Sequence, residues 1–183
     1  MSNFEKKASF FKFTTLLLLA IILSEFLFSK KLLNYFCPKP QEEIIQKAKP
    51  SATTQIEKSF EFPIKKNSKE KFKINITKAE KVKLVTTKNQ PVAPKEGEEF
   101  LLVYLEVENN LETPITIDSQ NYIRLIDEND KKLAPDFYNG PIQILPISTK
   151  KDQIGFVVKE GQNEFKLQVG EPEGKKEQVE FKF

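Results

Sequence analysis

The chain contains no histidine and no tryptophan, and it has one cysteine, Cys37, among 183 residues. Without imidazole, and with a single thiol, one chain cannot assemble a zinc site from Cys and His, nor a Ser-His or Cys-His catalytic arrangement. A lone cysteine also excludes an internal disulfide, so the fold must be stable without one. We therefore expect a protein that is not an enzyme, with no catalytic residue, no cofactor and no metal.

Charge is distributed unevenly along the chain. The formal net charge of +3 arises within residues 1–37, where five lysines oppose two glutamates. Residues 38–88 carry 13 lysines against 6 acidic residues, whereas residues 89–183 carry 11 basic residues against 18 acidic ones. This pattern predicts a basic stalk followed by an acidic domain.

One long apolar run, residues 10–28, has the sequence FFKFTTLLLLAIILSEFLF. As a helix it would be about 28 Å long, enough to cross a hydrocarbon core of about 30 Å. Small residues are missing from the positions that a signal peptidase requires, and bulky residues precede Cys37, so a retained anchor is favoured over a cleaved signal peptide or a lipid-modified cysteine. We expect a single transmembrane helix, with residues 1–37 forming a cytoplasmic tip and the membrane anchor.

Residues 38–70 are predicted to form a lysine-rich linker or stalk. Pro38 and Pro40 end any helix, because proline has no amide proton to donate. The following residues are polar and lack a sustained hydrophobic period. A short helix over residues 41–49 and an edge strand around Phe60 and Phe62 are the elements expected there.

From residue 71 to the C-terminus, apolar residues alternate with polar ones, which is the spacing of half-buried strands. The strongest run is Leu101, Val103, Leu105 and Val107, with further apolar residues on its other face, and it predicts a central strand. Turn-forming residues separate the runs. The strands are expected around Phe72 to Ile76, Val82 to Leu84, Leu101 to Val107, Ile115 to Ile117, Ile123 to Leu125, Ile154 to Val158, Phe165 to Val169 and Val179 to Phe183. Seven or eight such strands predict an all-β antiparallel β-sandwich over residues 71–183.

Two stretches of this domain carry a resemblance to a known family. They are GEEFLLVYLEVENNLETPITIDSQNYIRLIDENDKKLAPDF and ILPISTKKDQIGFVVKEGQNEFKLQV, within residues 97–169. The matching features are Gly97, Asn109-Asn110, Pro114, the strand that ends in Asp127, and Pro146 ahead of Gly155-Phe156-Val157-Val158. The pattern resembles exported bacterial immunoglobulin-like domains of unknown function, related to a secreted immunoprotective antigen.

The resemblance implies an immunoglobulin-like fold and export, with a signal peptide, lipid or membrane anchor. Lysines are balanced on the two sides of residues 10–28, so charge alone does not orient the helix. Export supplies the orientation. It implies a single-pass protein of the cell membrane whose C-terminal domain is extracytoplasmic.

Two features of the sequence have simpler interpretations than a binding site. Asp127, Asn129 and Asp130 resemble the start of a calcium loop, but Lys132 and Tyr138 occupy the positions that need Gly and Glu, so a hairpin turn is expected. The lysines between residues 65 and 88 are those of a solvated stalk, although they suit anionic polymer or lipid as well. They are not accompanied by stacking aromatic residues, and no nucleic-acid partner is expected.

Residues 134–148, APDFYNGPIQILPIS, form the longest apolar-rich segment without a two-residue period. Aromatic residues on loops make effective contacts, because few bonds must be immobilised on binding. The alternative is that these residues close one end or edge of the sandwich. The candidate partner-binding residues are Phe137, Tyr138, Ile142 and Ile144.

These features favour a non-catalytic, membrane-anchored extracytoplasmic module that binds or assembles with an envelope protein or polymer. Two alternatives remain. One is a hydrolase of an envelope polymer that uses carboxylates alone, since 18 acidic residues follow residue 88. The other is a structural subunit that pairs through an edge strand.

Overall fold

The computed structural model describes residues 46–47, 49–65, 68–87 and 90–183. The chain divides into two units, residues 1–42 and 43–183, and the first lies outside the described residues. The transmembrane helix expected at residues 10–28 is therefore not among them. No helix in the described part of the chain combines the length and apolarity needed to cross a membrane.

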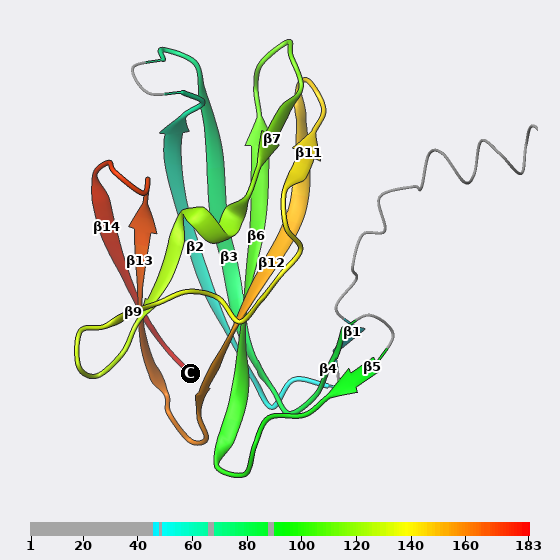
Figure 1. Ribbon diagram of the computed structural model, residues 1–183, viewed down its shortest axis with the longest axis vertical. Helices are drawn as coiled ribbons and strands as arrows, with labels where there is room; N and C mark the ends of the chain where they lie inside the picture. Colours follow the sequence, from blue (N-terminus) through cyan, green and yellow to red (C-terminus); the bar gives the residue numbers. More distant parts are fainter. Residues whose placement is uncertain (1–45, 48, 66–67, 88–89) are drawn as a thin grey trace, which may run out of the picture. The chain divides into compact units, whose positions relative to one another are not determined.

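The second unit is built from antiparallel strands, and a single short 3-10 helix, η1 (Ser119–Asn121), is the helical element among its described residues (Figure 1). The largest sheet has the strand order β10-β12-β6-β3-β2. Its central strand is the one predicted from the run at Leu101 to Val107. The bounds are β2 Ala52–Pro63, β3 Lys71–Val82, β6 Glu98–Asn109, β10 Phe137–Tyr138 and β12 Ser148–Lys159.

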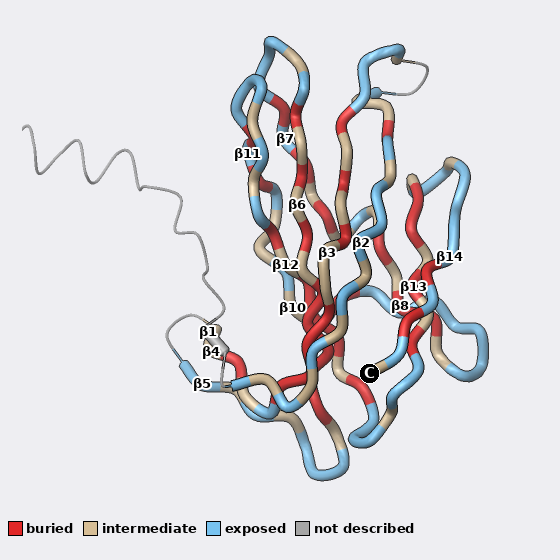
Figure 2. The backbone as a smooth tube through the Cα atoms, turned by 180° about the vertical axis from the view of Figure 1, so that it is seen from behind, coloured by how far each residue is buried: buried red, intermediate tan, exposed pale blue. Residues whose placement is uncertain are grey.

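A four-stranded sheet of order β14-β13-β8-β9 and a two-stranded ribbon, β11-β7, complete the core. The bounds are β7 Ile115–Ile117, β8 Ile123–Ile126, β9 Lys132–Leu133, β11 Ile142–Ile144, β13 Glu164–Gly170 and β14 Lys176–Lys182. Inward side chains from β3, β6 and β12 share one hydrophobic core with those of β7, β8, β11, β13 and β14. This all-β antiparallel arrangement, with buried residues between layers, is consistent with a β-sandwich (Figure 2).

A second, smaller hydrophobic cluster lies on the other face of β6. Phe100 and Leu102 are buried there with Val82 and with Val85 from β4 (Val85–Thr87). Strand β4 belongs to a small sheet with β1 (Gln46–Lys47) and β5 (Gln90–Val92). Because β6 is buried on both faces, its sequence is almost continuously apolar instead of alternating.

Two boundaries differ from those predicted. Strand β2 pairs with β3 from Ala52 to Pro63, so the sheet begins well inside residues 38–70, which were assigned to the linker. Strand β2 is an edge strand and mostly exposed, which is why little hydrophobic alternation marks it. In addition, Val82 ends the single long strand β3 and does not begin a new strand with Leu84.

Tyr104, on β6, gives a prediction about alkaline stability. Its hydroxyl donates to Glu80 Oε2 at 2.9 Å, and burial raises the pKa of Tyr104 from its ordinary value of 10.0 to about 12. The raised folded-state pKa means that this stabilisation is complete below pH 10 and is lost as the pH rises towards 12. We expect the free energy of unfolding of Tyr104→Phe to fall less between pH 10 and 12 than that of the unsubstituted protein, measured by urea unfolding at stepped pH. Equal loss in both proteins would contradict this assignment.

Candidate functional site

The four candidate residues of the loop 134–148 are separated by the fold. Ile142 and Ile144 lie on β11 and are buried in the main core, with 8% and 0% exposed. Phe137 is partly buried, and its ring packs edge-on against Phe100 at 4.9 Å. Tyr138 is 42% exposed. Of the four, Tyr138 alone presents much side-chain surface to a partner. Ile142 and Ile144 alternate with exposed Gln143, so this part of the segment is a half-buried strand, which was not predicted.

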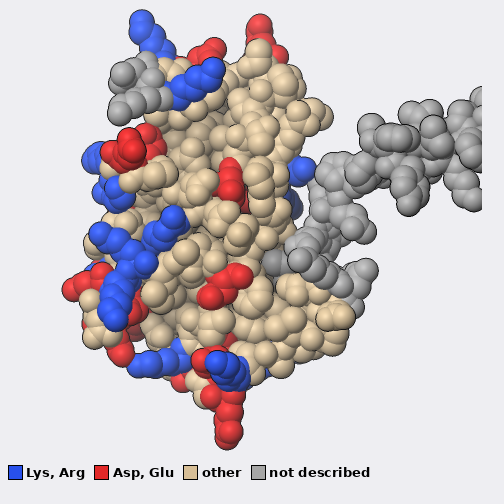
Figure 3. Space-filling model, viewed as in Figure 1, with Lys and Arg blue, Asp and Glu red and all other residues tan. Residues whose placement is uncertain are grey.

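A surface with little charge surrounds the β7-β11 ribbon. Residues 113–123 and 134–149 contain one acidic residue each and no lysine or arginine, although charged residues make up 30% of the whole chain. Pairing of Ile117 with Ile142 and of Ile115 with Ile144 places these two segments side by side. We call residues 113–123 and 134–149 the charge-poor face. Figure 3 shows a broad area with few charged groups on this side of the molecule; isolated acidic groups lie within it, and most lysines lie along its left and lower sides.

A groove of about 660 Å³ runs along the charge-poor face. Six consecutive residues, 113–118, line one wall, so the groove follows strand β7 along its length. Ile64, Lys65 and Glu70, at the turn between β2 and β3, also line the groove. Three of the residues 113–118, namely Ile115–Ile117, form strand β7 itself, and they span about 10 Å.

Strand β7 lines the groove, and among the described residues only one of its edges is paired. In the described residues it pairs with β11 alone, so its second edge has no strand partner. The side chain at its centre, Thr116, is exposed, whereas Ile115 and Ile117 point into the core. An unpaired strand edge presents backbone donors and acceptors that another extended chain can use. The groove and this edge together suit an extended polypeptide.

Two buried polar atoms without partners among the described residues belong to Asp118, which lines the groove, and to the adjacent Ser119, which does not. Asp118 Oδ2 accepts from Gln120 Nε2 at 2.9 Å, but Asp118 Oδ1 and the Ser119 hydroxyl are buried without a hydrogen-bond partner among the described residues. Burial, with smaller contributions from Glu171 and Asp118, raises the pKa of Tyr122, which also lines the groove. Unsatisfied buried groups are uncommon in native proteins and are often found at functional sites.

Leu145 and Ile147, in the loop between β11 and β12, form an exposed apolar tip. Leu145 and Ile147 are 63% and 68% exposed, and Ile147 has a φ of 48°, a left-handed conformation that is strained for a β-branched residue. Buried Asn109 holds the tip, since its amide group donates to the carbonyl of Leu145 at 3.0 Å. The Ile147 amide donates to the Leu111 carbonyl at 3.1 Å. The tip is thus fixed to the scaffold, and its apolar side chains point outward.

Chemically, this surface offers hydrogen-bonding backbone, apolar contacts and few charges. No group of three or more His, Cys, Asp or Glu residues in the described ranges is arranged to hold a metal ion. Sequence reasoning missed Thr116, Leu145 and Ile147. The absence of lysine and arginine from both segments of the charge-poor face was readable in the sequence, but only the pairing of β7 with β11 joins them.

Comparison with known proteins identifies a family. A family model described as "Domain of unknown function (DUF4352)" matches residues 64–179. A crystal structure of a conserved hypothetical protein from Bacillus anthracis is similar, with 19% identity and a TM-score of 0.45, over 69% of this chain and 99% of that chain. A functionally unknown protein from Listeria monocytogenes EGD-e has 13% identity and a TM-score of 0.42, over 76% of this chain and 89% of that chain. No curated protein matches. Because the family model covers more than half of the chain, this protein belongs to the DUF4352 family.

Proposed function

We propose that this protein is a non-catalytic, membrane-anchored extracytoplasmic module that binds a protein partner of the cell envelope along the charge-poor face. The observation that carries the proposal is the edge of β7, beside the groove, which has no strand partner in the part of the chain that the structure describes. A partner segment in extended conformation would add to that edge as a strand, with main-chain hydrogen bonds providing affinity.

The composition of the face supports a protein partner over a charged polymer. The cores of protein interfaces are depleted of charged residues, whereas anionic polymers are recognised by clustered lysine and arginine. Residues 113–123 and 134–149 contain neither lysine nor arginine. The exposed Leu145 and Ile147 would add apolar contacts at the end of the groove, and Tyr138 would contact the partner only if the interface reached β10.

The proposed location is the cell membrane, with the C-terminal domain outside the cytoplasm. Residues 10–28 have the length and apolarity of a single transmembrane helix. The resemblance to exported immunoglobulin-like domains related to a secreted immunoprotective antigen favours an extracytoplasmic C-terminal domain.

Site-specific photocrosslinking in intact cells tests the partner surface and the location together. A photoreactive amino acid is placed at Thr116 in the groove or at Leu145 in the tip, and captured proteins are identified by mass spectrometry. We expect both positions to give the same adduct with an envelope protein. With the photoreactive residue at position 145, Thr116→Arg should reduce that adduct at least about tenfold. With the photoreactive residue at position 116, the pair Leu145→Ser and Ile147→Gly should do the same, since loss of a central interface contact costs about 1.4 kcal/mol or more.

Thr53 provides the matched control, because it is an exposed threonine on the edge strand β2, outside the charge-poor face. The photoreactive residue at position 53 should not capture the partner, and Thr53→Arg should leave the adduct from position 116 unchanged. Capture of cytoplasmic proteins, or identical capture from positions 53 and 116, would contradict the proposal.

A further inference from the structure

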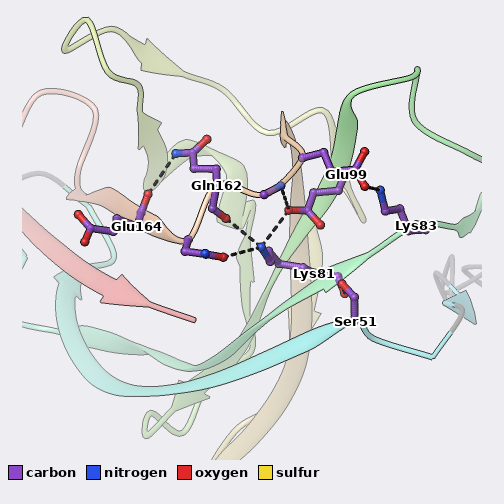
Figure 4. Close-up of polar contacts among 9 residues, drawn as sticks. Ser51, Lys81, Lys83, Glu99, Gln162 and Glu164 are labelled. Carbon is purple, nitrogen blue, oxygen red and sulfur yellow. Dashed lines mark hydrogen bonds and ion pairs between the residues drawn. The ribbon is translucent and has the colours of Figure 1, made fainter.

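A buried ion pair lies at one end of the core, away from the charge-poor face. Lys81, on β3, and Glu99, on β6, have only 7% and 4% of their side chains exposed, and Lys81 Nζ is 3.0 Å from Glu99 Oε1. Lys81 pairs across the sheet with the core residue Leu101, two residues along from Glu99. Paired residues, and residues two apart on one strand, face the same side of a sheet. The side chains of Lys81 and Glu99 therefore point to the same side as the core residue Leu101 (Figure 4).

The amide group of Asn163 completes the cluster. Asn163 lies in the turn between β12 and β13, and its Oδ1 accepts from Lys81 Nζ at 3.0 Å. The Gln162 carbonyl accepts from the same nitrogen at 2.9 Å. The amine nitrogen of Lys81 therefore contacts both the carboxamide of Asn163 and the carboxylate of Glu99.

The turn that carries Asn163 is fixed on several sides. The Gly161 amide donates to Glu99 Oε1 at 3.3 Å, and the Glu160 amide donates to the Gly97 carbonyl at 2.8 Å. The Asn163 carbonyl accepts from the Phe183 amide at 3.0 Å, and the Phe183 ring lies 5.4 Å from Lys81 Nζ. Holding two reacting groups in fixed proximity can replace a large part of the entropy cost of a bimolecular reaction.

We propose that Lys81 and Asn163 react with each other to form an intramolecular isopeptide bond, with Glu99 as the proton acceptor. Lys81 Nζ and Glu99 Oε1 are 3.0 Å apart, a distance at which a proton can pass directly from the amine to the carboxylate. A neutral amine is the nucleophilic form of lysine. Glu99 is placed to accept that proton, and Asn163 is placed to accept the attack.

The reaction balances without an oxidant, a reductant or a further reactant. Glu99 takes one proton from the Lys81 ammonium, and the freed lone pair of Nζ attacks Cγ of Asn163. One proton then passes from Nζ to the amide nitrogen, the Cγ–Nδ2 bond breaks and ammonia leaves. The products are a secondary amide between Lys81 and Asn163, a protonated Glu99 and ammonia. Because Asn163 itself lies on an exposed turn, ammonia can escape directly to solvent.

The bond would join positions 82 residues apart in sequence, linking β3 to the β12–β13 turn. Closing a long loop covalently restricts the unfolded chain and favours the folded state. The consequence is a domain that retains a covalent loop after denaturation, even though the chain cannot form an internal disulfide.

Peptide mapping of the purified full-length protein tests the proposal. Acylation of Lys81 blocks tryptic cleavage after it, so peptide 79–83 should be found joined to peptide 160–166, with a mass lower than their sum by one ammonia molecule. The intact protein should show the same mass deficit relative to its Asn163→Ala variant, after correction for the substitution. Recovery of peptides 79–81 and 160–166 as separate, unmodified species would overturn the proposal, and so would conversion of Asn163 to aspartate by water.

Variants separate the chemistry from folding. Asn163→Ala changes an exposed position and should fold, yet it should abolish the joined peptide. Glu99→Gln should reduce the joined peptide at least tenfold if Glu99 accepts the proton. Lys83→Arg is the matched control, because Lys83 pairs with Glu160 at the exposed surface, and the joined peptide should persist. Loss of the joined peptide in Lys83→Arg, or its full retention in Glu99→Gln, would contradict the assigned roles.

Discussion

Phe72→Ala should lower the free energy of unfolding by about 3 to 5 kcal/mol, the largest effect expected from a single substitution in the core. Phe72 is 1% exposed and lies between the two layers. Its ring packs against Phe62 at 5.7 Å and edge-on against Tyr122 at 5.5 Å, so truncation leaves a cavity bordered by two aromatic rings. Urea unfolding of residues 46–183, followed by circular dichroism, measures the change.

Phe60 is the matched control, because it lies on the edge strand β2 and is only partly buried against the same core. Phe60→Ala should cost clearly less than Phe72→Ala, since less apolar area is returned to water. Equal losses would mean that β2 is packed as tightly as the central strands, contrary to its edge position.

Asn109→Ala should lower the free energy of unfolding by about 2 to 4 kcal/mol, because several hydrogen bonds of one buried amide are lost together. Asn109 is fully buried, and its Nδ2 donates to the carbonyls of Thr113 at 2.8 Å, Leu145 at 3.0 Å and Ile144 at 3.3 Å. Its Oδ1 accepts from the Leu111 amide at 3.0 Å. Without these bonds, both loops of the apolar tip lose their attachment to β6. Urea unfolding and amide exchange around residues 111–114 and 145–147 would detect the loss.

The neighbouring Asn110 is exposed and offers an internal comparison. Asn110→Ala should change the stability by no more than about 0.5 kcal/mol, as is usual for surface substitutions. If Asn110→Ala were the more damaging of the two, the hydrogen-bond assignment at the end of β6 would be wrong.

Much of the fold could be predicted from alternation because most strands bury one face only. Strands β7, β8, β12, β13 and β14 all lie at predicted positions, and the Asp127 turn forms the expected hairpin between β8 and β9. The edge strand β2 was harder to predict over its full length, since an exposed strand needs few apolar residues. The limit of alternation is clearest in β3. A bulge between Ile76 and Lys78 moves the core-facing positions from Ile76 to Ala79, so a strict period of two fails within one strand.

The candidate site was only partly predictable. The segment 134–148 was selected for its apolar residues, but the structure buries Ile142 and Ile144 and exposes Leu145 and Ile147. Hydrophobicity alone does not distinguish a core residue from a contact residue, because both are apolar and the difference lies in what packs against them. Lys81 was assigned to a solvated stalk with the other lysines between residues 65 and 88, but it lies on β3 and is buried beside Glu99.

The sequence by itself determined the all-β class, the central position of β6 and the absence of imidazole chemistry, because each depends on residue type and local spacing. Only the tertiary structure decided which strands are neighbours and which side chains meet. The pairing of β7 with β11 leaves one β7 edge beside a groove, and the end of the sandwich brings Lys81 to Asn163 across 82 residues. Such long-range contacts depend on register and layer packing, which local periodicity does not encode.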